Sequence, residues 1–129
     1  MFKLLLIALA GSAGALTRYG VSGGIQTWLD RTQSGWTFPW GTMLVNITGC
    51  LMIGLLAPLL FERARPEYRD MVLIGFLGAY TTWSSFGYET IRFLNDGQFK
   101  AATVYVVSTN LFCLAAVWLG YRLMTRFLA

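Results

Sequence analysis

The most unusual residues of this sequence are small and hydroxyl-bearing side chains set among apolar ones. Residues 75–86 read GFLGAYTTWSSF, with two glycines three positions apart and then four hydroxyl residues within five positions. Glu89 follows shortly after. In a membrane, clustered Gly, Thr and Ser favour a broken helix, whose freed carbonyls need hydroxyls, water or a cation as partners. The pattern therefore predicts a helix broken at its centre, with polar groups beside the break.

Further polar residues in the neighbouring apolar segments are spaced to share helix faces. Thr42 and Asn46 lie four positions apart, and so do Tyr105, Thr109 and Cys113 in succession. Residues four apart lie on one face of a helix. Two interpretations remain open for them. They hold helices together through hydrogen bonds, at about 1 kcal/mol each, or they line a pore; spacing alone slightly favours the first.

Two charged residues also fall within apolar segments. Arg18 lies well inside the first segment, where a central arginine costs about 2.5–3.5 kcal/mol. Either it faces protein, water or a partner group, or the span ends near it and the side chain reaches the interface. Glu89 precedes Arg92 by three positions, so an ion pair between them is favoured over a proton-carrying role.

The elements that must position these residues are apolar helices. Of the 129 residues, 56% are hydrophobic and 12% are charged, about half the ~25% charged residues of soluble domains. The excess apolar surface must face lipid. Four segments are close to the ~20 residues that cross a bilayer as a helix: residues 4–28, 41–61, 71–93 and 101–122. The sequence thus predicts an all-α membrane protein with a single four-span domain over residues 1–129.

Polar stretches separate these spans. They are 30–40, which contains Gly35, then the charged loop 62–70 and the tight turn 94–100. A secretory signal peptide is disfavoured, because the first apolar region is too long and no small-residue cleavage site precedes a soluble domain.

The cysteines and the absence of histidine limit the possible metal chemistry. Cys50 and Cys113 both lie in apolar runs and are interpreted as small buried hydrophobic residues rather than a disulfide. With no histidine and no cysteine cluster, nothing indicates a transition-metal site.

The charges that flank the spans bear on orientation. With four spans, both termini and the second loop share one side, which carries Lys3, Arg63, Arg65, Arg69, Arg122 and Arg126. The other side carries Arg31, Arg92 and Lys100. The positive-inside rule predicts cytoplasmic termini. The expected location is the cell inner (plasma) membrane, as a multi-pass protein. The net charge of +4 suits anionic lipid and gives no argument for nucleic acid.

Three motifs resemble those of the Fluc (CrcB) fluoride channels. They are GALTRY at 14–19, GTMLVNITG at 41–49 and the third-span stretch 75–86. The order matches, and the resemblance covers the whole chain. It implies a passive, fluoride-selective ion channel, not an enzyme, that exports cytoplasmic fluoride and so relieves fluoride toxicity. It also implies an antiparallel, dual-topology homodimer with two pores.

The resemblance also implies roles for individual residues. Pore-lining positions match Asn46, Trp83, Phe86, Ser85, Thr42, Thr109 and Cys113. Arg18 and Glu89 match vestibule positions, and the carbonyls of Gly78 and Thr81 match those around a structural Na⁺ at the dimer interface. The sequence departs from the family pattern at Ala79, Trp83, Ser85 and Cys113. Trp83 replaces a phenylalanine, and its indole N–H either holds fluoride or its bulk narrows the path.

Two other classes of function compete with a channel. Small proton-coupled multidrug exporters are also four-span, dual-topology dimers, but they depend on a glutamate in the first span, where this chain has Arg18. A non-transporting membrane scaffold would leave residues 75–86 unexplained.

Overall fold

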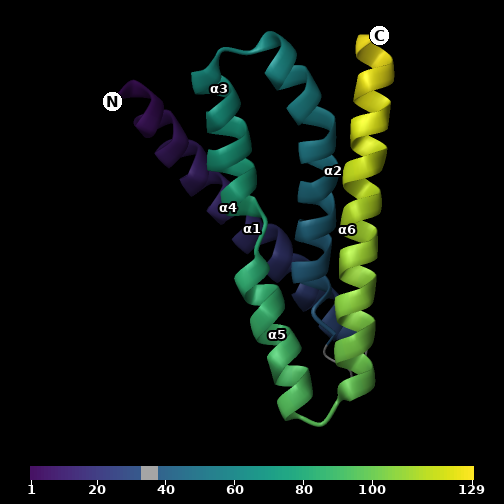
Figure 1. Ribbon diagram of the computed structural model, residues 1–129. Coiled ribbons are helices and arrows are strands. Elements are labelled where there is room, and N and C mark those ends of the chain that lie inside the picture. Colours follow the sequence, from purple (N-terminus) through teal and green to yellow (C-terminus); the bar gives the residue numbers. More distant parts are fainter. Residues whose placement is uncertain (33–37) are drawn as a thin grey trace.

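Three long helices form most of the structure. The computed structural model describes residues 1–32 and 38–129, and every regular element in that part is helical (Figure 1). Helices α1 (Phe2–Thr32), α2 (Trp40–Arg63) and α6 (Phe99–Leu128) are each long and apolar enough to cross a membrane. Such apolar helices confirm the prediction of an all-α membrane protein. Residues 33–37 of the predicted loop at 30–40 lie outside the described residues.

The segment at 71–93 is broken, as the sequence predicts. A π-helix, η1 (Met71–Leu77), continues directly into α4 (Gly78–Tyr80). The chain is then extended at Thr81 (φ −80°, ψ 157°) and Thr82 (φ −147°, ψ 109°) before α5 (Trp83–Asn95) begins. Figure 1 shows the two helical halves joined by this short non-helical link.

The prediction of a loop over 62–70 is wrong in part. Helix α2 runs on to Arg63, and a short helix, α3 (Pro66–Asp70), starts after Arg65. Proline suits the first position of a helix, where its missing N–H has no intrahelical role. It also drives the preceding residue out of the α region, and Arg65 is extended. The turn predicted near 94–100 is confirmed, with Gly97 at a positive φ of 71°.

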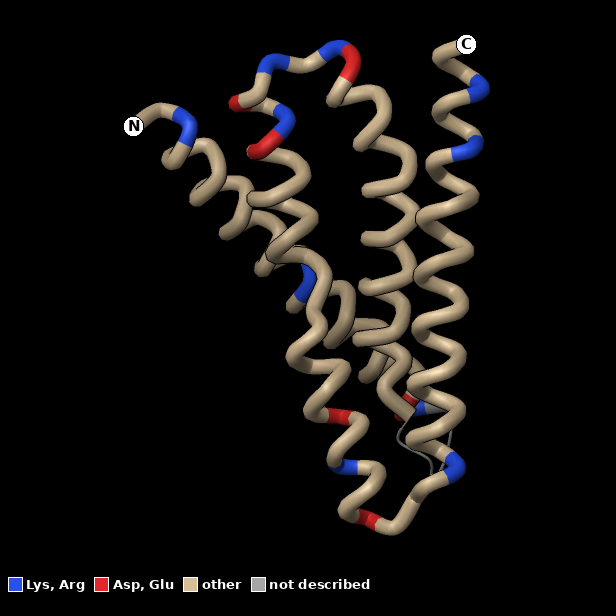
Figure 2. The backbone as a smooth tube through the Cα atoms, in the orientation of Figure 1, with Lys and Arg blue, Asp and Glu red and all other residues tan. Residues whose placement is uncertain are grey.

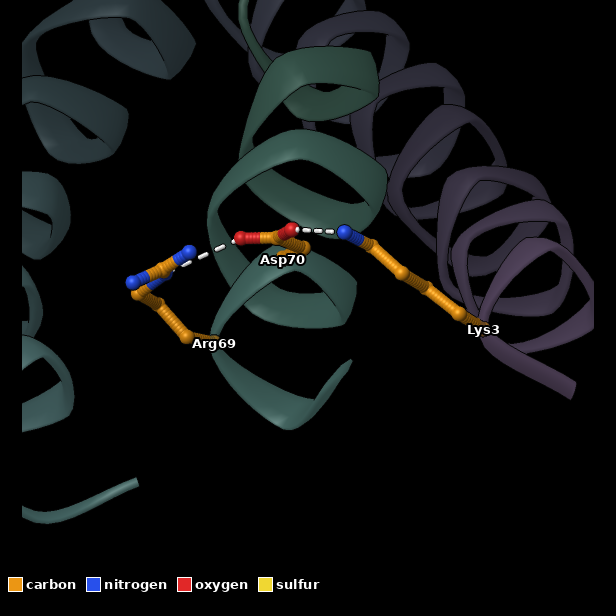
Figure 3. A network of polar contacts seen from close by, with 3 residues as sticks. All are labelled: Lys3, Arg69 and Asp70. Carbon is orange, nitrogen blue, oxygen red and sulfur yellow. Dashed lines mark hydrogen bonds and ion pairs between the residues drawn. The ribbon is translucent and has the colours of Figure 1, made fainter. Parts of the chain in front are cut away.

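The chain places both termini and the α2–α3 connection at one end (Figure 1). Lys and Arg gather at that end, as the blue segments of Figure 2 show. There Asp70 forms ion pairs with Lys3 and Arg69, which tie the start of α1 to the end of α3 (Figure 3). These two cations hold the pKa of Asp70 below its usual range, chiefly through hydrogen bonds to the carboxylate.

Helices α2 and α6 lie side by side and run in the same direction (Figure 1). Their backbones approach closely where glycine permits it. A Cβ on Gly54 would lie 2.3 Å from the carbonyl oxygen of Val117, and one on Gly120 would lie 2.6 Å from that of Leu51. Small residues that allow such an approach are typical of helix packing in membranes. This pairing fixes which residues of α2 and α6 face each other.

Candidate functional site

The helix break is held by a side chain from α2. Asn46 accepts a hydrogen bond from the backbone amide of Thr82 (2.8 Å) and donates one to its carbonyl (3.1 Å). The Thr82 amide lies in the extended link and has no helical carbonyl to bond, and a buried backbone group without a partner is costly. Asn46 is 8% exposed. Its amide thus fixes the break in place.

Thr82 also begins α5. Its Oγ1 accepts a hydrogen bond from the amide of Ser85 (3.2 Å) and lies 3.0 Å from Ser85 Oγ, to which it donates. This is an N-cap, which satisfies an amide at the start of a helix. The N-terminal end of α5 therefore points at the break, and helix N-termini carry partial positive charge that favours anions.

The break removes two regular helical donors from neighbouring carbonyls. In a continuous helix the amides of Thr82 and Ser85 would serve the carbonyls of Gly78 and Thr81. Here those amides bond to Asn46 and to the Thr82 hydroxyl instead. Freed carbonyl oxygens are the kind of donor that replaces the hydration shell of an alkali cation. Gly78 and Thr81 thus fit Na⁺ in donor type.

Arg18 lies at the same break. Its Nη1 donates a hydrogen bond of 3.4 Å to the Thr81 carbonyl. The arginine therefore contacts a protein carbonyl, as the first of the two interpretations of its position expects. A cation held by the Thr81 oxygen would share it with this guanidinium.

A cavity of about 280 Å³ lies beside the break. Its lining includes five of the predicted pore residues, together with both predicted sodium ligands: Asn46, Trp83, Phe86, Thr109, Cys113, Gly78 and Thr81. The rings of Trp83 and Phe86 are 4.8 Å apart between centroids. Thr109 is 3% exposed, and its hydroxyl has no hydrogen-bond partner within residues 1–32 and 38–129. The cavity thus presents an unused buried donor.

A larger cavity of about 460 Å³ opens near the start of α2 and the end of α5, and its lining includes Thr42, Glu89 and Arg92. Glu89 accepts hydrogen bonds from Thr42 (2.7 Å) and from the Tyr105 hydroxyl (2.6 Å). Its carboxylate therefore joins α2, α5 and α6.

The predicted Glu89–Arg92 ion pair is wrong: no such pair occurs in the described part of the chain. Two hydroxyl donors from other helices reach the carboxylate instead. Spacing along one helix could not reveal those donors. The sequence pattern does not identify Tyr105 as a partner of Glu89. The four-residue spacing between Tyr105 and Thr109 indicates only that these two residues share a helix face.

Two further predicted site residues lie apart from the smaller cavity. Ser85 bonds to Thr82 and lines neither cavity, and Thr42 lines only the larger one. The two predicted vestibule residues are also separate. Arg18 contacts the break, whereas Glu89 lies at the larger cavity.

Comparisons with known proteins point in one direction. Residues 5–121 match the profile of the family described as "CrcB-like protein, Camphor Resistance (CrcB)". The chain is 43% identical over 126 residues to the fluoride-specific ion channel FluC of Methylococcus capsulatus, covering 96% of this chain but only 53% of that protein. It is 41% identical to the FluC of Nitrosococcus oceani, covering 94% of each. With the FluC of Acidobacterium capsulatum it shares 41% identity, over 98% of this chain and 99% of that one.

Proposed function

The chain belongs to the CrcB-like protein family and is a fluoride-specific ion channel, not an enzyme, and we propose that fluoride passes through the cavity beside the helix break. The observation that carries this placement is the Thr109 hydroxyl, which is buried there and has no hydrogen-bond partner among the residues that the structure describes. A buried donor left unpaired costs about 1–3 kcal/mol. An ion that accepts a hydrogen bond from this hydroxyl offsets that cost.

The lining suits a small, strongly hydrated anion. Asn46 and Thr109 supply amide and hydroxyl donors that replace water around fluoride. The edges of aromatic rings carry partial positive charge, so Trp83 and Phe86 can contact the ion without binding it tightly. The α5 N-terminus adds a favourable dipole. A conducting site must also release its ion, and these neutral groups do so more readily than a fixed cation.

The larger cavity is proposed as the aqueous mouth of this path. Glu89 and Thr42 lie at it, and Thr42 is one helical turn from Asn46. Passive flow through the path lets fluoride leave a cell down its own gradient. A proton-coupled exporter is the less suitable alternative, because the charge embedded in α1 is Arg18 and its partner is a carbonyl.

A second copy of the chain completes the proposed channel, as an antiparallel, dual-topology homodimer in the inner (plasma) membrane. Trp83 is 72% exposed although it lines the cavity beside the break. A pore aromatic left open in one chain is expected to face a partner. In this arrangement the broken segment 71–95 is the third of four crossings, beside α1, α2 and α6. The Gly78 and Thr81 carbonyls of both chains would hold a structural Na⁺ at their interface.

A liposome assay tests the proposed function. Purified protein is reconstituted in vesicles loaded with fluoride or chloride, and a potassium ionophore clamps the voltage. Fluoride is expected to leave within seconds, while chloride stays. Folded protein that releases no fluoride would contradict the channel, and release of both halides would contradict selectivity.

A further inference from the structure

The two cysteines of the chain face each other inside the proposed fluoride path. Cys50 on α2 and Cys113 on α6 are both free thiols, and both are half-buried in the lining of the 280 Å³ cavity. Neither thiol is enclosed in the core, because both residues contribute to the lining of this one cavity. The expectation that they are simply buried hydrophobic residues is therefore incomplete.

The pairing of α2 with α6 holds the two thiols together. Gly54, one turn beyond Cys50, packs against the backbone of Val117, one turn beyond Cys113. Because the two helices run in the same direction, the residues one turn earlier also face each other. The thiols are thus fixed by close backbone packing rather than by flexible loops.

We propose that Cys50 and Cys113 form a two-coordinate site for Hg²⁺, and that the bound ion obstructs the fluoride path. Thiolates are soft ligands and select soft metal ions. The described residues contain no group of three or more His, Cys, Asp or Glu that could hold a metal, which disfavours ions that need four ligands, such as Zn²⁺. Mercury(II) readily takes two sulfurs in a line.

Charge balance also favours a divalent ion here. Each thiol gives its proton to water and its sulfur electron pair to the metal, so one Hg²⁺ replaces two protons. The product, sulfur–mercury–sulfur, is neutral. A neutral product suits an apolar, membrane-embedded cavity, where an uncompensated charge is costly. No oxidant or reductant is required.

The obstruction part of the inference rests on the proposed function, whereas the site itself does not. Cys113 lines the same cavity as Asn46, Phe86 and Thr109. A metal that bridges α2 and α6 there would fill part of the cavity. It would also replace the two thiol S–H groups, which are weak hydrogen-bond donors, by a rigid sulfur–mercury–sulfur bridge.

The site is tested first by intact mass spectrometry. One equivalent of HgCl₂ per chain is added to the purified protein in detergent, and the protein is then unfolded and treated with iodoacetamide. Bridging predicts the mass of the chain plus one mercury minus two hydrogens, with no alkylation. A mercury on one sulfur with the other alkylated, or two mercury ions per chain, would overturn the site. Cys50→Ser and Cys113→Ser are each expected to lose the two-hydrogen signature.

Fluoride efflux from liposomes then tests the obstruction, with each variant compared with its own flux before metal. One equivalent of Hg²⁺ is expected to cut wild-type flux by about tenfold, as a blocked pore requires, and excess dithiothreitol to restore it. Zn²⁺ at the same concentration is expected to have no effect. Bridged protein with unchanged flux would overturn the obstruction and the path past Cys113, while leaving the metal site and the channel activity standing.

Discussion

Thr109 is the residue on which the proposed path most depends, because its buried hydroxyl has no partner in the described part of the chain. Thr109→Val keeps the shape of the side chain and removes the donor. We expect fluoride flux to fall by about tenfold, the effect of losing about 1.4 kcal/mol of ion stabilisation. Thermal stability is expected to stay equal or rise, because an unsatisfied polar group is lost.

Thr103→Val is the matched control for this change. Thr103 lies on the same helix, is exposed, and donates to the Phe99 carbonyl. Its variant is expected to conduct as the wild type does. Thr109→Val channels that conduct normally would remove this hydroxyl from the path.

The sequence predicts which residues share a helix face, but not what that face contacts. Asn46 and Thr42 were placed on one helix face, and both do form hydrogen bonds to the broken segment or its α5 half. Spacing left open whether such residues line a pore or hold helices together. Asn46 makes two bonds to one backbone unit and also lines the cavity. The two interpretations are therefore compatible at this residue.

At the level of helices, the contact between α2 and α6 is the one least tolerant of change. A Cβ at Gly54 would lie 2.3 Å from the Val117 carbonyl, so Gly54→Ala must push the helices apart. We expect a destabilisation of about 1–3 kcal/mol, the usual cost of overpacking. Unfolding in a detergent titration measures it.

Gly87 on α5 provides the control, because a Cβ there meets nothing within 4 Å. Gly87→Ala is expected to stabilise the protein by about 0.5–1 kcal/mol, the gain from replacing a helical glycine. Equal effects of the two substitutions would contradict the close packing of α2 with α6.

The ion pairs of Asp70 make a pH-dependent link between α1 and α3. Because Lys3 and Arg69 lower the pKa of Asp70, their stabilisation is fully present above its unfolded pKa, near 3.9. It is lost as pH falls through the lower folded pKa. Asp70→Asn is therefore expected to be less stable than wild type at neutral pH, with the difference vanishing in acid. Thermal unfolding against pH measures this, and a difference that grows in acid would contradict it.

The broken helix was predictable because Gly, Thr and Ser cluster where a lipid-facing helix would be apolar. Its position at Thr81 and Thr82 was not, since that depends on Asn46 reaching the Thr82 backbone from another helix. The partners of Glu89 were missed for the same reason. Spacing shows which residues share a face but not which helix that face meets.

For the whole molecule, the proposed antiparallel dimer predicts two orientations in one membrane. Cations gather at the end that holds both termini (Figure 2). The sequence places six Lys and Arg residues beside the spans on that side and three on the other, which is a small bias for setting orientation. A cleavable tag at the C-terminus is expected to be protease-accessible on about half of the chains in sealed vesicles. Cleavage of all tags or none, with sealed vesicles verified, would contradict dual topology.

The parallel register of α2 and α6 has an evolutionary consequence. Thr42 and Tyr105, Asn46 and Thr109, and Cys50 and Cys113 form successive rungs, each 63 positions apart in the chain and one turn from the next. The first rung meets Glu89 and the second meets the helix break, whereas the third places two thiols in the cavity lining. One rung of such a stack can change its side chains, for example from a hydroxyl to a thiol at Cys113. The glycine contacts beyond it meanwhile keep the other rungs aligned. Selection can thus adjust the path one step at a time.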